Sequence, residues 1–463
     1  MSQLPPRTYG FWTCVFVVAA SMVGSGILMT PGRTLAETQS PTALFIVWTL
    51  GGFLALCGAL TVAQLGAALP HVGGDYVFVR RAFGDATAFV FGWSCLLFTF
   101  SGPLALIAVM AVDYIFPDND AIQGTNATLI ATGIIILFTL LHSLGQSESA
   151  WIQNLTTLVK LLIFVGFAAA GFLTQHGSYE HFASGAPIAA VGGWSLLAKH
   201  LTYAMYAYSG WNGAGYLAGE VRDPEKTLPR SLIVGCLLVT GLYLLMNAVY
   251  VYSISAARLA EVDELDVRRI GWLAGEILFG KQVSHVLSII FGIGLLATIS
   301  ALLFTAPRIA FMMARDGLMP RQIGWLHASR NTPIPATLLV GGLSVIMLWS
   351  GKFNEVLDFT SVGLTALGGL TVASIFPLWW KREVHWPFRL PLFPIPPILF
   401  LAITVWTVIL ATIEAPVPGL GSMGAIVLAI PLYSIYRWTS GQHSRGMIDE
   451  VPHENSPRQS MED

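Results

Sequence analysis

The stretch VVAASMVGSGILMTPG, residues 17–32, decides the fold. It belongs to an apolar run long enough to cross a bilayer, yet Gly24, Ser25 and Gly26 lie in its middle and Pro31 near its end. Glycine and proline both weaken a helix. A segment that served only as an anchor would gain nothing from such a weak point. The stretch therefore predicts a helix that is interrupted at membrane depth.

The composition is that of an integral membrane protein. Of the 463 residues, 54% are hydrophobic and only 11% are charged, whereas a soluble domain carries about a quarter charged residues. The net charge of −2 gives no reason to expect nucleic acid as a partner. No cofactor or metal site is expected, because the four cysteines lie in apolar runs without metal-ligand spacing. They are Cys14, Cys57, Cys95 and Cys236.

The apolar runs predict an all-α polytopic membrane protein with twelve transmembrane helices. A helix needs about 20 apolar residues to cross the hydrocarbon. Asp113 and Glu414 fall near span ends and are expected to be solvated. The predicted spans are 11–36, 42–69, 86–116, 126–145, 151–174, 194–219, 231–253, 283–314, 335–350, 355–380, 393–412 and 420–438.

The distribution of Lys and Arg predicts the orientation, because cytoplasmic connections carry the excess of positive charge. This places residues 1–10 and a disordered tail, 439–463, in the cytoplasm, with the membrane-spanning domain at 11–438 between them. The basic residues on the predicted cytoplasmic side are Arg7, Arg80, Arg81, Arg222, Lys226, Arg230, Arg308, Arg315, Arg321, Arg330, Lys381, Arg382, Arg389, Arg437, Arg445 and Arg458.

The sixth span repeats the irregularity of the first. Its stretch MYAYSGWNGAGYLAGE, residues 205–220, holds Ser209, Gly210, Asn212 and Gly213 in an apolar run. Interrupted helices in corresponding places, five spans apart, are typical of an inverted repeat of five plus five helices. The repeats would be residues 11–174 and 194–380, followed by two further helices at 393–438.

The two interruptions together predict a binding site at the middle of the membrane. Unwinding at Gly24–Gly26 would expose backbone N–H groups at the start of a half-helix, where the helix dipole favours a carboxylate. Unwinding between Tyr206 and Gly210 would free carbonyl oxygens for an ammonium group. Both charges together describe an α-amino acid. The alternative is that the glycines only allow helices to pack closely.

Several motifs resemble those of the amino acid–polyamine–organocation (APC) superfamily, and within it prokaryotic L-type amino-acid transporters. They are VGSGILMTP in the first span, PHVGGDYVFVRRAFG after the second, YAYSGWNGAGYLAGEVRDPEKTLPRS through the sixth, LFTAPRIAFMMARDGLMP in the eighth and RNTPIPATLL before the ninth. The resemblance covers residues 8–440. It implies the LeuT-like fold and alternating access.

The resemblance also implies roles for individual residues. The backbone of Ser25 and Gly26 would hold the substrate carboxylate, with Gly24 and Ile27 forming the turn. The remaining roles are carbonyls for the amino group at Met22, Tyr206 and Ser209, a gate at Tyr206, and support of the unwound segment by Gly210, Asn212 and Gly213. Relatives from eukaryotes carry a bulky aromatic residue where this chain has Gly213.

Lys160, inside the fifth span, is a candidate in its own right, since a lysine at membrane depth is costly. The resemblance implies that its ammonium replaces the sodium ion of sodium-coupled relatives, near Thr298 and Ser300. The alternative is a side chain that reaches the headgroups. A position about nine residues from the helix start, near 14 Å deep, favours the functional role.

The sequence thus predicts a sodium-independent amino-acid transporter, an exchanger of neutral L-amino acids in a bacterial-type inner membrane. A proton-coupled importer with a titrating Lys160 is the first alternative. An amino-acid sensor and a polytopic membrane enzyme are more remote, and no enzyme activity is expected. The partners are the lipid bilayer and the substrate. A disulfide-linked heavy chain is not expected, because the connection PDNDAIQGT, residues 117–125, lacks the cysteine of eukaryotic relatives.

Overall fold

The structure is a computed structural model that describes residues 9–70, 73–117, 122–144, 150–187, 191–327, 332–381 and 384–440. Residues 1–8 and 441–463, which hold most of the predicted N-terminal segment and tail, lie outside the described residues, as does part of the 117–125 connection. Within these ranges the chain forms helices and no named strand, apart from one isolated bridge between Tyr9 and Val221. The prediction of an all-α chain is confirmed.

Nine helices in the described part are long and apolar enough to cross a membrane, and a tenth span is a bent pair of helices. The nine are α3 (Pro41–Ala68), Asp85–Ile115, α7 (Thr125–Ser143), α8 (Ala150–Leu173), α10 (Pro224–Ser253), α14 (Lys281–Arg315), Phe353–Lys381, α18 (Ile395–Glu414) and α19 (Pro416–Ser440).

Two of the twelve predicted spans are shorter helices in the structure. The sixth is α9 (Trp194–Ala207) followed by a 3-10 segment, η4 (Gly213–Glu220), and the ninth is α15 (Ile334–Trp349). Neither alone has the length of a complete straight span, so length and apolarity support ten spans among the described residues. The remaining spans agree with the predicted ranges to within a few residues, except that α10 begins seven residues earlier, at Pro224.

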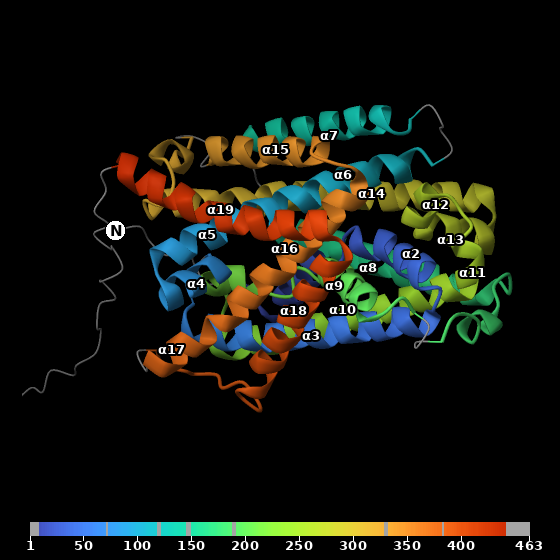
Figure 1. The fold of residues 1–463 in the computed structure, drawn as a ribbon, viewed down its shortest axis with the longest axis horizontal. Helices are drawn as coiled ribbons and strands as arrows, with labels where there is room; N and C mark the ends of the chain where they lie inside the picture. The colour runs from blue at the N-terminus through green and yellow to red at the C-terminus, as the bar shows by residue number, and fades with distance from the viewer. Residues whose placement is uncertain are drawn as a thin grey trace, which may run out of the picture.

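The helices form one bundle, whose two ends are distinct (Figure 1). We call one the α4 end, after the short helix α4 (Asp75–Phe83), which lies there beside α17 (Ile375–Lys381). The other is the α12 end, with α11 (Ala256–Leu259), α12 (Glu264–Arg268) and α13 (Ile270–Phe279). By the predicted orientation, the α4 end would face the cytoplasm.

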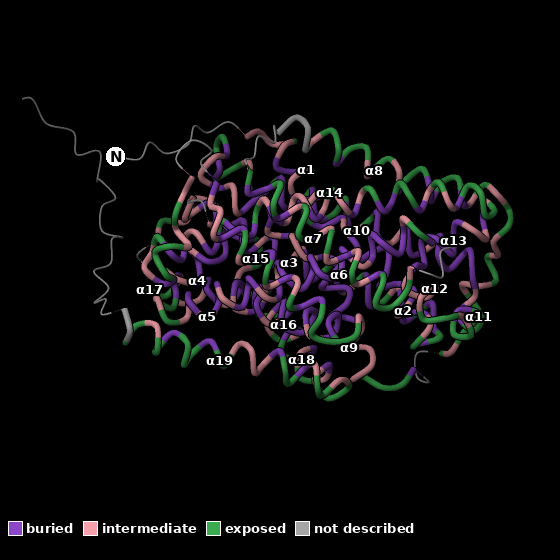
Figure 2. The backbone as a smooth tube through the Cα atoms, turned by 90° about the horizontal axis from the view of Figure 1, so that it is seen from above, coloured by how far each residue is buried: buried purple, intermediate pink, exposed green. Residues whose placement is uncertain are grey.

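Burial differs sharply between the central and peripheral spans. The span Asp85–Ile115 comprises α5 (Asp85–Cys95), a π-helical segment η1 (Leu96–Ser101) and α6 (Gly102–Ile115). In its most apolar stretch of 18 residues, 89% of the residues are buried, against 28% in that of α7 and 22% in that of α19. Figure 2 shows the exposed residues along the rim of the bundle. Large apolar side chains such as Leu162 and Ile413 are exposed there. A rim of this kind suits a protein that is surrounded by lipid.

The first span is interrupted where its glycines predict. Helix α1 (Phe11–Met22) ends one residue before Val23, whose backbone is extended, and α2 (Gly26–Thr38) begins after Ser25. The two helices are bent by 45° relative to each other. Pro31 lies inside α2 without ending it. The weak point is therefore the Gly-Ser-Gly segment rather than the proline.

The sixth span is interrupted as well. Helix α9 ends at Ala207, Tyr208–Asn212 form turns, and η4 continues to Glu220. Gly210 has a φ of +96°, a conformation that residues with a side chain rarely adopt. This glycine therefore permits a change of chain direction that a regular helix could not make.

One expectation about isolated carboxylates was wrong. Asp113, in α6, is only 6% exposed, and Arg268 of α12 lies 2.7 Å from it. Sequence position alone suggested solvent because α6 ends two residues later, but α12 and α13 cover this end of the bundle. Glu414, by contrast, is exposed, as expected.

Candidate functional site at the two helix interruptions

The two interruptions lie against each other. A Cβ atom placed on Gly26, at the start of α2, would lie 2.4 Å from the Cα atom of Ala207, at the end of α9. A Cβ atom on Gly210 would lie 2.6 Å from the carbonyl oxygen of Ser21. Only glycine allows this approach, because real Cβ atoms do not come so close to other atoms. The glycines of both interruptions are therefore needed to bring the two main chains together.

The start of α2 presents buried main-chain donors. The first hydrogen bonds into this helix run from the N–H groups of Leu28 and Met29 to the carbonyl of Ser25. The N–H groups of Gly26 and Ile27 precede this ladder, as the first N–H groups of any helix do. Ser25, Gly26 and Ile27 are all buried. Such donors at the positive end of a helix dipole suit an anion such as a carboxylate.

Tyr206 connects the two interruptions through its side chain. Its phenol oxygen lies 3.1 Å from the hydroxyl oxygen of Ser25, within hydrogen-bond distance, and the residue is 4% exposed. The ring comes from the last turn of α9, while Ser25 precedes the first turn of α2. A side chain in this position covers the interruption of the first span, which is the geometry that a gate requires.

Two of the three carbonyl groups predicted to accept an ammonium, those of Met22 and Tyr206, already have donors in the chain. The hydroxyl of Tyr243, in α10, donates to the carbonyl oxygens of Met22 at 2.6 Å and Ala207 at 2.9 Å. The backbone N–H of Ser209 donates to the carbonyl of Tyr206 at 3.1 Å. A carbonyl oxygen has two lone pairs, so a second donor can still approach. Sequence reasoning missed Tyr243, since a tyrosine in an apolar span looks like a core residue.

Lys160 lies beside the interruption of the first span. Its ammonium on α8 donates to the carbonyl oxygen of Val23 at 3.0 Å and to the hydroxyl of Thr298, in α14, at 3.3 Å. One cation on α8 thus contacts two other spans, the first and α14. Ser300, the other predicted neighbour, has its hydroxyl 2.8 Å from a ring nitrogen of His142, in α7.

Asn212 and Gly213 of the sixth span contact α4 and α1, respectively. The amide of Asn212 donates to the carboxylate of Asp75, the first residue of α4. A Cβ atom on Gly213 would lie 2.7 Å from the hydroxyl of Ser21, in α1. Gly213 therefore packs against the first span.

A cluster of charged and aromatic side chains lies between the interruptions and the α12 end. The hydroxyl of Tyr203, in α9, donates to the carboxylate of Asp358, in α16 (Phe353–Ala373). The guanidinium of Arg33 lies 5.2 Å from the centre of the Tyr203 ring and pairs with Glu37 at 2.5 Å. Glu37 also accepts from Lys199 at 3.1 Å. The cluster links α2 and α9 to α16.

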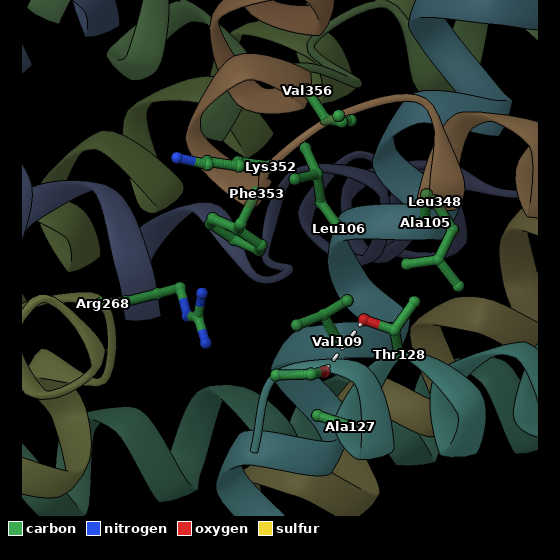
Figure 3. A pocket seen from close by; sticks show the side chains of 12 residues that line it. Ala105, Leu106, Val109, Ala127, Thr128, Arg268, Leu348, Lys352, Phe353 and Val356 are labelled. Atoms are coloured by element: carbon green, nitrogen blue, oxygen red, sulfur yellow. Dashed lines mark hydrogen bonds between the residues drawn. The ribbon is translucent and has the colours of Figure 1, made fainter.

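Two cavities open at the α12 end, beyond this cluster. One has a volume of about 260 Å³ and is lined by Arg33 and Glu37, among others. The second, of about 290 Å³, is shown in Figure 3, where Leu106, Val109 and Phe353 surround it. Neither of these two is lined by a residue of the interruptions at 23–25 or 208–212. Neither of these two cavities therefore reaches the interruptions themselves.

The comparisons with known proteins agree on one kind of protein. A family model described as Amino acid permease matches residues 9–434. The b(0,+)-type amino acid transporter 1 of Mus musculus is 26% identical over 422 residues, 89% of this chain and 83% of the relative. The Asc-type amino acid transporter 1 of Mus musculus is 28% identical, over 92% of this chain and 80% of the relative. The cystine/glutamate transporter of Homo sapiens is 29% identical, over 91% of this chain and 83% of the relative.

Proposed function

The chain belongs to the amino acid permease family of the APC superfamily, a family of multi-pass membrane transporters and not of enzymes, and we propose that it exchanges neutral L-amino acids by alternating access without sodium. The single observation that carries this proposal is the ammonium of Lys160, 3.0 Å from the carbonyl oxygen of Val23 at the first interruption. A fixed cation at this carbonyl supplies the positive charge that a bound sodium ion would otherwise bring.

The substrate would bind as a zwitterion between the two interruptions. Its carboxylate would accept from the N–H groups of Gly26 and Ile27, which lie at the positive end of α2. Its ammonium would donate to carbonyl oxygens near Met22, Tyr206 and Ser209. Tyr206 would close over it, since its hydroxyl reaches Ser25. Discontinuous helices that meet at the midplane support this kind of site.

The surroundings of the site favour amino acid substrates whose side chains are neutral. Lys160 and Asp75, the ionisable groups beside the interruptions, already hydrogen-bond to neutral groups of the chain, the carbonyl of Val23 and the amide of Asn212. A charged substrate side chain would need a further ion of opposite sign, and an unpaired charge in a buried site is costly. Among the relatives named above, only the cystine/glutamate transporter has particular amino acids in its name, so the substrate class proposed for this chain rests on the argument from charge.

The arrangement would be the twelve-helix fold with repeats at residues 11–174 and 194–380 and two further helices at 393–438. Helix α9 with η4 would count as the sixth span, and α15 as the ninth, although both are short. The protein would lie in the inner membrane of a bacterial-type cell, with the α4 end and both termini in the cytoplasm. It would work without a disulfide-linked heavy chain.

The test is counterflow in proteoliposomes loaded with a panel of unlabelled amino acids. We expect labelled neutral L-amino acids to accumulate only when an amino acid is present inside, at the same rate in sodium and in choline buffer. Accumulation that needs sodium would contradict the proposal. Uptake driven by an imposed pH gradient without internal amino acid would instead favour the proton-coupled alternative, in which Lys160 titrates.

A further inference from the structure

Asp75 is a buried carboxylic acid whose position none of the transport chemistry above explains. It is the first residue of α4, in the connection between the spans Pro41–Ala68 and Asp85–Ile115, and it is 4% exposed. Its Oδ2 atom accepts from the amide of Asn212 and, at 3.1 Å, from the hydroxyl of Thr371. Its Oδ1 atom is buried and has no hydrogen-bond partner in the described part of the chain.

These contacts connect three separate elements at the α4 end. Asp75 belongs to α4, Asn212 to the interruption of the sixth span, and Thr371 to α16. Tyr216 of η4 adds to the junction, since a Cβ atom on Gly74 would lie 2.7 Å from its ring. Any movement of η4 away from α4 must therefore break the bond between Asp75 and Asn212 and expose the carboxyl group to water.

Within the described residues, which leave out positions 71 and 72, no cation compensates the Asp75 carboxylate. The ionisable side chains in electrostatic contact with it are Tyr216 of η4 and Cys95 of α5, and a phenol and a thiol are neutral at physiological pH. Helix α16 contributes only the hydroxyl of Thr371. Arg80, also in α4, pairs instead with Asp85 at 2.8 Å and Asp316 at 2.7 Å.

Burial without a cation changes the acidity of this group. Desolvation raises the pKa of Asp75 to about 7, although the bonds from Asn212 and Thr371 act in the opposite direction. A carboxyl group in water has a pKa of about 3.9. The closed arrangement therefore binds a proton better than an opened, hydrated one. By linkage, acid stabilises the closed arrangement, and this stabilisation is lost as the pH rises toward 7.

We propose that Asp75 is a proton-binding site that latches the sixth span to α4 and α16, so that protonation holds the α4 end closed and loss of the proton releases it. The inference rests on the proposed alternating-access function, in which this end must open. The proton enters and leaves on the same side of the membrane, so none is transported. The latch adjusts the transport rate to the pH at the α4 end.

Cys14 offers a native reporter of opening. It is fully buried in α1, which packs against η4 and α10. The experiment measures alkylation of Cys14 by N-ethylmaleimide, followed by peptide mass spectrometry, from pH 6 to pH 8. Alkylation also depends on the thiolate fraction. The rate in the native protein is therefore divided at each pH by the rate in the Asp75→Asn variant, whose side chain has the same size and does not titrate.

The expected ratio rises about tenfold between pH 6 and pH 8, with its half-point near pH 7, because the fraction of closed molecules without the proton rises by that factor. Asp223→Asn, the same change at an exposed carboxylate of the α4 end, should leave the profile as in the native protein. A ratio that stays constant or falls with pH would overturn the inference.

A second variant guards against misfolding of Asp75→Asn. Thr371→Val removes one donor from the carboxylate, which should move the half-point of opening to higher pH. An unchanged half-point would overturn the inference as well. Amino acid exchange is measured on the same preparations. If exchange persists while the ratio stays constant, the latch is disproved and the proposed transport function stands. If exchange is absent while the ratio rises, the latch stands and the proposed transport function is disproved.

Discussion

The ammonium of Lys160 lies 3.0 Å from the carbonyl oxygen of Val23, at the point where the first span is interrupted. The same nitrogen is 3.3 Å from the hydroxyl of Thr298. The carbonyl of Val23 follows the last residue of α1, where a helix leaves carbonyl groups without internal partners. Lys160 therefore compensates for the interruption with a charge-assisted hydrogen bond, which is stronger than a neutral one.

Replacement of Lys160 by alanine should strongly reduce transport and leave the protein folded. A hydrogen bond to a charged group is worth about 1.5–3 kcal/mol, so we expect the exchange rate to fall by on the order of 10- to 100-fold in a counterflow assay. Lys226→Ala, at an exposed position of α10, is the matched control and should exchange normally. Size-exclusion chromatography reports folding. Full activity in Lys160→Ala would contradict the assigned role.

The hydroxyl and the ring of Tyr206 should contribute differently. Tyr206→Phe removes only the bond to Ser25, worth about 1 kcal/mol, and should raise the KM for exchange about fivefold. Tyr206→Ala also removes the ring that covers the interruption, and should reduce transport severely. Equal activity of the two variants would show that the ring has no gating role.

Gly26 should not tolerate a side chain. Its Cβ atom would overlap Ala207, and a forced insertion into a packed site costs about 1–3 kcal/mol. We expect Gly26→Ala to lower the melting temperature and to stop exchange. Gly241→Ala is the control, since a Cβ atom at that helical position of α10 meets nothing within 4 Å. Two variants with the same stability would argue against the close approach.

Tyr243 should be more important than its apolar surroundings suggest. Tyr243→Phe would remove the donor to the carbonyl oxygens of Met22 and Ala207, and a buried polar group left unpaired costs about 1–3 kcal/mol. Tyr250→Phe, two turns further along the same face of α10, removes a hydroxyl that has no hydrogen-bond partner in the described chain and should be neutral or stabilising. Thermal unfolding in detergent compares the two variants, and a larger loss for Tyr250→Phe would contradict the assignment.

The sequence predicted the interruption of the first span because Gly24 and Gly26 lie in an apolar run and a second glycine cluster, with Gly210, lies in the corresponding place of the sixth span. It could not predict that Tyr243 bridges both interruptions, since a tyrosine in an apolar helix has the same appearance whether or not its hydroxyl finds a partner. Nor could it predict the burial of Asp75 or Asp113. An acid beside a helix end is usually solvated, and only the packing of η4 and α12 covers these two.

Span lengths show a related limit. The apolar run at 335–350 predicted a complete span, and its helix α15 has 16 residues. The run at 194–219 contains a helix of 14 residues and a 3-10 segment of 8. Hydropathy measures how apolar a run is, but it does not report where the backbone leaves the α-helix.

The central claim is that the two interruptions bind the charged ends of an amino acid through the main chain. The most direct measurement is competition against exchange in proteoliposomes, with a transported L-amino acid, its methyl ester and its N-acetyl derivative as competitors. The account predicts that the free amino acid competes and that each blocked derivative competes at least tenfold more weakly, because each lacks one of the two charges. Equal competition by either derivative would contradict it.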